Sequence, residues 1–359
     1  MNFDLSEEQY ALQDVALRLL GDVYPLTRLN RIVHEGKGLD REGWKRLAEL
    51  GYAGLGIPET YGGMGLKLLD RALVSECIGY CGAPGHFVAH VMATEALVRA
   101  GSEAQKAEWL PRLATGEIIA SIAFAEEGEA WQPEEWRLTH DRGRLRGSKR
   151  NVLHAQEADL FVVGLAGGAL ALVTKQAQGP TVEPADGIDR TRPMAWLHFD
   201  DTPCELLPDG VPAAGSVRDA GLVLLAADAF GGATRAIELA VDYVKTRVQF
   251  DQVIGGFQAI KHQIADAGTL VEAGRGLYWY AAHVFDENPE ESPRMAALAK
   301  ALLADRFEVA CRRMVELHGG IGFTWEHHAQ VWFKRALFDR CFLGQPSLHR
   351  ERAAQLAGW

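Results

Sequence analysis

Two adjacent glycines near the end of the chain, Gly319 and Gly320, are the first candidates for a ligand site. They stand in the stretch Val315–Glu326, which reads VELHGGIGFTWE and begins as a helical pattern. Glycine has no Cβ, so a backbone with two consecutive glycines lets a bulky ligand approach closely. The stretch therefore predicts a turn, directly after a helix, that lies against a large ligand.

Histidine pairs are the second set of residues whose spacing suits chemistry. His86 and His90 are four residues apart, and His327 and His328 are adjacent. Neither pair has the acidic or cysteine neighbours that would complete a set of metal ligands. We expect these side chains on a helix surface or in a cleft, and we expect no metal site. The chain also has no G-x-S-x-G, P-loop or G-x-G-x-x-G motif.

The elements that position these residues fall into three parts, and the first, residues 1–117, is predicted to be helical. Ser6 and Gln9 have the spacing of a capping box at the start of a helix. A second helix centres on Trp44–Leu50 and ends at Gly51. Further helical patterns cover residues 68–80, 87–100 and 101–117.

The middle part, residues 118–215, is predicted to be a small antiparallel β domain. Short β-branched or apolar runs at 118–124, 160–163, 169–173 and 196–199 are separated by glycines and prolines. Gly167 and Gly168 predict a hairpin turn. Residues 206–215, rich in Pro and Gly, read as the linker out of this domain.

The last part, residues 216–359, is predicted to be a four-helix bundle. Long helical patterns run over 220–249, 258–284, 292–317 and 326–343, with a clear break at Pro289 and Pro293. Helices of this length with short connections form up-and-down bundles, which implies contacts within an oligomer. The fold class is therefore α+β, with several domains.

Composition limits the partners. The 359 residues carry a formal net charge of -11, which argues against nucleic acid and anionic membranes. The five cysteines, an odd number, favour free thiols in a reducing cytoplasm. The N-terminus has no apolar core of an export signal, and we expect no segment apolar enough to span a membrane.

The order of the parts and several motifs resemble the acyl-CoA dehydrogenase family over essentially the whole chain. Trp44–Leu66 is similar to the family's W-x-x-L-A-E…P-E-x-Y-G-G-x-G segment, and His318–Thr324 is similar to its H/F-G-G-x-G-F/Y-T element, which approaches FAD. The resemblance implies the cofactor FAD, an acyl-CoA substrate and an electron-transfer flavoprotein as the electron acceptor.

A further motif, Arg247–Gln258, resembles the family's R-x-x-F-G-x-x-I-x-x-F-Q. In the family these side chains hold FAD from the neighbouring subunit, which here implies Arg247, Phe250 and Gln258. A guanidinium suits a pyrophosphate, and an amide can hydrogen-bond the cofactor. Asp251 stands in place of the family's glycine.

The resemblance also assigns cofactor contacts to the glycine turn, through Gly319, Gly320 and Glu316. Glu316 aligns with a position that is often glutamine in the family. A carboxylate beside a pyrophosphate must turn away or accept a hydrogen bond from a donor.

Two features of the family are missing. Its flavin-ring segments, Thr-Glu-Pro-x-A-G-S-D and Trp-Ile-Thr-Asn, align with Ala125–Trp131 and Asn151–His154, which lack the threonines and the stacking indole. Its catalytic Glu, in Tyr-Glu-Gly-Thr, aligns with Leu343. Desaturation of an acyl-CoA needs a carboxylate to remove the α-proton while the β-hydrogen leaves as hydride to the flavin.

Three hypotheses follow. The leading one is a non-catalytic subunit of a heteromeric acyl-CoA dehydrogenase, such as a heterotetramer, that holds the ADP part of FAD for a base-bearing partner. It resembles divergent members that act in fatty acid or steroid side-chain degradation. The second is a self-sufficient homo-oligomer with a relocated base, for which Asp219, Asp228 and Asp339 are candidates, although solvated helix positions are expected for them. The third is a flavin-free scaffold protein.

Overall fold

The computed structural model describes residues 4–36, 40–128, 130–176 and 178–359, so the first three residues and Glu129 lie outside the described part. The chain forms two compact units, each built from separate stretches of sequence. Unit 1 comprises Met1–Gly36, Ala72–Ala83 and Val223–Trp359, and unit 2 comprises Lys37–Arg71 and Pro84–Leu222. The predicted order of a helical part, a sheet part and a second helical part is confirmed, while the exact domain borders stay a prediction.

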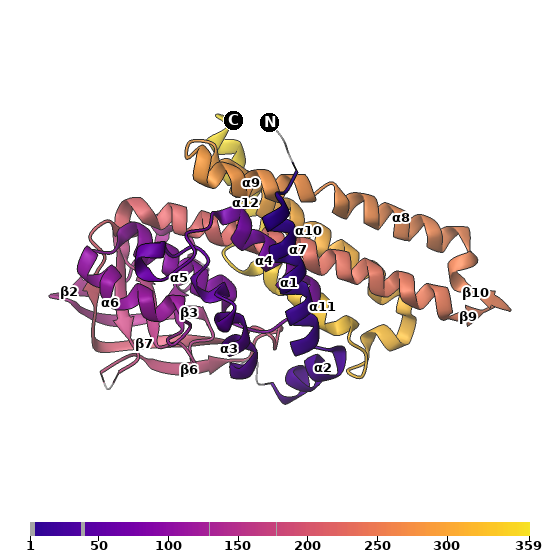
Figure 1. Cartoon of the computed structure of the whole chain (residues 1–359), viewed down its shortest axis with the longest axis horizontal. Helices are drawn as coiled ribbons and strands as arrows, with labels where there is room; N and C mark the ends of the chain where they lie inside the picture. Colours follow the sequence, from indigo (N-terminus) through magenta and orange to yellow (C-terminus); the bar gives the residue numbers. More distant parts are fainter. Residues whose placement is uncertain (1–3, 37–39, 129, 177) are drawn as a thin grey trace. The chain divides into compact units, whose positions relative to one another are not determined.

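In the described residues of unit 1, the regular structure is helical except for one small hairpin (Figure 1). The Ser6 hydroxyl accepts a hydrogen bond from the Gln9 amide, which confirms the predicted capping box at α1. The helices of this unit are α1 (Glu7–Val23), α2 (Leu26–Glu35), most of α4 (Leu68–Cys81) and of α7 (Gly210–Thr246), α8 (Gln258–Glu272), α9 (Arg275–Glu287), α10 (Ser292–His318), α11 (Ala329–Cys341) and α12 (Pro346–Leu356).

Helix α7 begins earlier than predicted, at Gly210, so the expected linker over 206–215 is wrong for most of its length. Pro212 lies in the first turn of the helix, where its missing N–H has no partner to lose. By length and hydropathy α7 also passes the test for a membrane span, contrary to expectation, but 83% of its most apolar 18 residues are buried within the protein. Such burial is typical of a core helix.

The expected single helix over 258–284 is wrong as well, because α8 ends at Glu272 and α9 starts at Arg275. A Cβ at Gly274 would stand 2.4 Å from the Leu303 side chain on α10. The chain therefore turns where a glycine lets it pack closely, although the apolar period continues across the corner.

In its described residues, unit 2 holds two four-stranded sheets and the helices α3 (Arg41–Glu49), α5 (Phe87–Ala100) and α6 (Glu103–Ala114). Helix α5 packs against β1 and β4, and α6 packs against α5. In one sheet the strands lie side by side in the order β1 (Ala120–Ala123), β4 (Leu160–Gly164), β5 (Leu170–Thr174) and β8 (Glu205–Leu206). In the other sheet the order is β2 (His140–Asp141), β3 (Arg144–Leu153), β7 (Met194–Pro203) and β6 (Thr181–Ala185).

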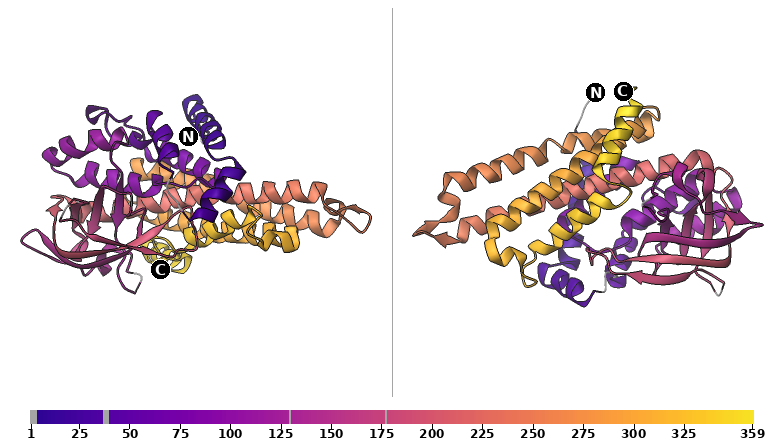
Figure 2. Two further views of the ribbon diagram at one scale, coloured as in Figure 1. Left: turned by 90° about the horizontal axis from the view of Figure 1, so that it is seen from below. Right: turned by 180° about the vertical axis from the view of Figure 1, so that it is seen from behind.

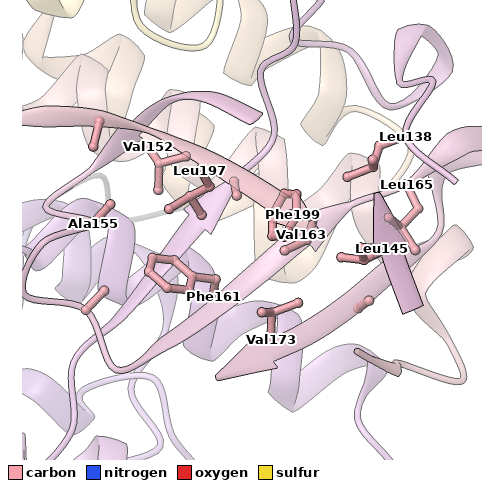
Figure 3. Packing of buried hydrophobic residues seen from close by; sticks show 14 residues of the cluster. Leu138, Leu145, Val152, Ala155, Phe161, Val163, Leu165, Val173, Leu197 and Phe199 are labelled. Carbon is pink, nitrogen blue, oxygen red and sulfur yellow. The ribbon is translucent and has the colours of Figure 1, made fainter. Parts of the chain in front are cut away.

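Side chains from both sheets form one apolar core, seen in Figure 3. Burial alternates along β7, where Leu197 and Phe199 point into this core, as expected for a strand with one covered face. Among the strands that the structure describes, β1 and β4 pair in parallel and the other pairings in the two sheets are antiparallel. The predicted turn at Gly167 and Gly168 is confirmed, since it joins β4 to its antiparallel neighbour β5.

Candidate cofactor site

The two predicted cofactor-binding segments meet in unit 1. Tyr243, in the last turns of α7, stacks on His318 at the end of α10, with the ring centroids 4.3 Å apart. The Arg247 amide donates a hydrogen bond to the Tyr243 carbonyl oxygen, and Gly319 directly follows His318. One aromatic contact therefore holds the arginine segment beside the glycine turn.

A short hairpin carries the first segment. After α7, strands β9 (Val248–Gln249) and β10 (Gln252–Val253) pair antiparallel and lead into α8, and the hairpin projects at the end of the α7–α8 pair in both views of Figure 2. Its turn residues, Phe250 and Asp251, both have positive φ, 53° and 60°. That conformation is unusual for phenylalanine and tends to persist at functional sites.

The predicted residues of this segment are open to solvent. The Phe250 side chain is 85% exposed, and Arg247 and Gln258 are exposed as well. Gln258 is the first residue of α8. No ion pair of Arg247 is found among the described residues. An exposed aromatic ring next to an unpaired guanidinium is a surface suited to a covering ligand or partner.

The glycine turn follows α10 as predicted. Gly319 has φ of 64°, and residues Gly319–Phe323 form the short helix η6. Both Gly319 and Gly320 are exposed, and a Cβ on either would meet no atom within 4 Å. The turn therefore has open space on its outer side, as a close approach of a ligand requires.

A groove of about 760 Å³ adjoins this turn. Glu316 lines the groove and forms an ion pair of 2.7 Å with Arg313, so its carboxylate has a donor, as a position near a pyrophosphate demands. Phe323, 77% exposed, also lines the groove and was not predicted as a site residue. The signal for it was present, because Phe323 belongs to the glycine motif itself. The remaining lining residues are Val309, Arg312, Arg313, Val315 and Phe333.

The flavin-contact segments of unit 2 are arranged differently. The Glu126 carboxylate accepts hydrogen bonds from Lys149 Nζ at 2.6 Å and from the amides of Arg137 and Leu138 at 2.9 and 3.0 Å. Lys149 is fully buried, and burial lowers the pKa of its ammonium to about 8. The polar groups of this segment are thus bound to one another rather than left for a flavin ring.

The second flavin segment also lacks the groups for the ring. Asn151, at the expected indole position, has a positive φ of 53°, and Leu153, at the expected threonine position, is buried. The residues of unit 2 therefore do not fit the flavin end of FAD, whereas the exposed segments of unit 1 fit its ADP end.

The position of the missing base lies in the connection between α11 and α12. Leu343 is fully buried there and has a φ of 60°. The three alternative carboxylates are buried, so the expectation of solvated positions is wrong. Asp228 binds Arg335 through both oxygens at 2.8 and 2.7 Å, and Asp219 pairs with Arg218 at 3.0 Å. Asp339 is buried on α11. Carboxylates held by buried guanidinium groups are poorly placed to take a substrate proton.

The expectation of a surface or cleft position for His86 and His90 is also wrong, because both are buried in unit 2. His86 packs on His154 at 4.3 Å between ring centroids, and both His86 and His90 contact Trp44. Burial lowers the pKa of His90 to about 4 and that of His86 well below its usual value. In the described part of the chain, no group of histidine, cysteine and acidic residues has the geometry of a metal site.

Comparison with known proteins identifies the family of the chain. Sequence models of the acyl-CoA dehydrogenase N-terminal and C-terminal domains match residues 6–117 and 209–357. Acyl-CoA dehydrogenase IpdE2 of Mycobacterium tuberculosis is 30% identical over 331 residues, covering 92% of this chain and 91% of that protein. The chain therefore belongs to the acyl-CoA dehydrogenase family, whose members are FAD-dependent oxidoreductases of acyl-CoA thioesters.

Solved structures share the same fold. The butyryl-CoA dehydrogenase of Megasphaera elsdenii superposes with a TM-score of 0.89 at 23% identity, covering all of both chains (100% and 100%). A structure described as the Tcur3481-Tcur3483 steroid ACAD G363A variant superposes with a TM-score of 0.90 at 27% identity, covering 98% of each chain.

Proposed function

We propose that this chain is the non-catalytic subunit of a heteromeric acyl-CoA dehydrogenase. In this assembly, Arg247, Phe250 and Gln258 hold the ADP part of an FAD whose flavin end lies in a base-bearing partner subunit. Gly319, Gly320 and Glu316 border the same ligand. When bound, FAD supplies the acceptor for the hydride that leaves the acyl-CoA.

One observation carries the proposal: the ADP-side segments are exposed and brought together, while the flavin-side and base positions are closed. Phe250 is 85% exposed, but Leu343 is fully buried. A chain that acted alone would need a carboxylate at the substrate, and the candidate Asp228 is bound by Arg335. The Tcur3481-Tcur3483 steroid ACAD structure, whose description joins two protein names, is similar to this chain. This similarity supports a two-component enzyme for a bulky acyl-CoA.

The test is co-expression with base-bearing members of the same family, followed by purification through a tag on this chain alone. We expect a stable complex with one FAD for every two chains, located in the cytoplasm, that reduces an electron-transfer flavoprotein when given acyl-CoA. The chain purified alone is expected to be colourless and inactive. A yellow, active preparation of the isolated chain would contradict the proposal.

A further inference from the structure

The connection between α11 and α12 is held from inside unit 1 by a buried ammonium group. Lys300 on α10 is fully buried, and its Nζ donates hydrogen bonds to three carbonyl oxygens. They belong to Asp339, to Arg340 at 3.3 Å and to Gly344 at 3.3 Å. The last carbonyls of a helix have no partner within the helix, and a cation there also meets the negative end of its dipole.

A second buried donor fixes the residue between these carbonyls. His349 on α12 donates through Nε2 to the Leu343 carbonyl oxygen at 3.0 Å. The contact sets the tautomer, because a carbonyl oxygen can only accept. Consecutive carbonyls of the connection, those of Leu343 and Gly344, are thus bound by donors from two different helices.

The backbone of the connection is strained, and it persists because these donors define it. Leu343 has φ of 60°, a left-handed conformation that is sterically unfavourable for a residue with a branched side chain. Gly344 has φ of 106°, and a Cβ there would stand 2.7 Å from the Leu348 side chain. Strained residues of this kind are kept only where the surroundings over-determine them.

We infer that Lys300 and His349 are positioning residues that lock the α11–α12 connection in a shape in which residue 343 faces the protein interior. The inference rests on the proposed function and deepens it. The absence of a base is then a property of the whole connection, and a carboxylate placed at 343 would be buried instead of reaching a thioester.

Burial of Lys300 makes the lock sensitive to pH, and the acidic groups around it only partly oppose that effect. From α11 it is faced by Asp339, Arg340 and Cys341, and on its own helix by Asp305. Asp305 in turn pairs with Arg340 and with Arg350 of α12. Burial lowers the pKa of Lys300 to about 8. Above that pH its hydrogen bonds to the carbonyls lose the strength that a charged donor gives.

Hydrogen–deuterium exchange of residues 340–349 in the full chain tests the lock, with rates corrected for the intrinsic effect of pH. We expect exchange to accelerate about tenfold as the pH rises through 8, since charge-assisted bonds are roughly twice as strong as neutral ones. Lys300→Met should exchange fast already at pH 7 and show no step. The control Lys45→Met removes an exposed lysine side chain on α3 and should match the wild type. Equal exchange rates in Lys300→Met and in the wild type would overturn the inference. If the variant does not fold, the wild type alone decides, and the absence of a step in its exchange rate near pH 8 would overturn the inference.

A gain-of-function test addresses chemistry. Leu343→Glu is assembled with a partner subunit whose own base has been changed to glutamine, and acyl-CoA dehydrogenation is measured. We expect FAD to be retained and activity to stay at background. Activity from Leu343→Glu would refute the lock while leaving the FAD-holding role intact. Conversely, an active isolated wild-type chain would refute the proposed function without bearing on the exchange result.

Discussion

The hairpin end of unit 1 and the flavin-contact segment of unit 2 differ in how exposed their side chains are and in whether their polar groups have partners. At the hairpin, an aromatic ring is 85% exposed on a strained backbone, and the neighbouring guanidinium of Arg247 has no ion pair among the described residues. In unit 2, Glu126 and Lys149 satisfy each other and three backbone groups. Exposed polar groups without a protein partner are available to a ligand, whereas polar groups that bind one another inside the protein are not.

Breaking the Glu126–Lys149 pair is expected to have the largest effect on stability and none on FAD. Lys149→Met leaves Glu126 with only its two amide donors, and loss of one partner of a buried pair costs about 3 kcal/mol. Urea denaturation measures the change in the free energy of unfolding. The double variant Glu126→Gln with Lys149→Met should recover much of the loss. A drop in FAD per folded complex would mean that this segment still serves the flavin.

Acid should destabilise unit 2 through its buried histidines. The folded pKa of His90, about 4, lies below its ordinary value of 6.5, so the unfolded chain binds more protons between these values. The contribution is complete above pH 6.5 and is lost as the pH falls toward 4. The two pKa values of His90 differ by 6.5 − 4 = 2.5, and each pKa unit corresponds to about 1.36 kcal/mol. The loss in the free energy of unfolding is therefore about 3 kcal/mol.

Urea titrations between pH 7.5 and 4.5 check this expectation. His90→Gln should flatten the acid side of the profile, whereas His140→Gln, on exposed β2, should leave it unchanged. A wild-type profile that is flat across this range would show that the buried histidines do not limit stability in acid.

The opposite behaviour is expected of Arg247 at the hairpin. Arg247→Ala should lower the affinity of the complex for FAD by about tenfold to a hundredfold, because a hydrogen bond to a charged group contributes about 1.5–3 kcal/mol. Its exposed side chain should leave the free energy of unfolding within about 0.5 kcal/mol of wild type. Fluorescence titration of the FAD-depleted complex gives the affinity, with Arg18→Ala on α1 as the matched control. Unchanged FAD affinity would remove Arg247 from the site.

Local patterns in the sequence predicted local structure well. The helix over 87–100, the capping box at Ser6 and the turn at Gly167 all depend on residues close in sequence. The start of α7 was predicted too late because of Pro212. Proline is common both in linkers and in the first turn of a helix, and the sequence alone does not distinguish the two. The corner at Gly274 was missed because its cause, the close approach of Leu303, is a contact between distant residues.

The candidate site divides in the same way. Its glycines, arginine and aromatic ring belong to short motifs and could therefore be proposed from the sequence alone. The burial of Asp228 was not, because its partner Arg335 lies 107 residues away and nothing local marks the pair. Likewise, no pattern around Lys149 indicates that its ammonium is buried and bound to Glu126.

Substitution of Phe250 is expected to have the smallest effect on FAD affinity, and it tests the difference between the two regions most directly. Phe250→Ala should weaken FAD binding about fivefold, because an aromatic contact is worth about 0.5–1.5 kcal/mol beyond the area it buries. In the isolated chain, Phe250→Ala should leave the free energy of unfolding unchanged or raise it, because the lost ring is exposed and buries little surface. Phe250→Gly, which relieves the positive φ of 53°, should stabilise further yet weaken FAD binding to the same extent. A gain in stability together with a loss of FAD affinity would indicate that Phe250 is strained in the fold and serves the ligand. A loss of stability in both variants would instead make Phe250 a structural residue, and the exposed end of unit 1 would no longer differ in kind from the closed segment of unit 2.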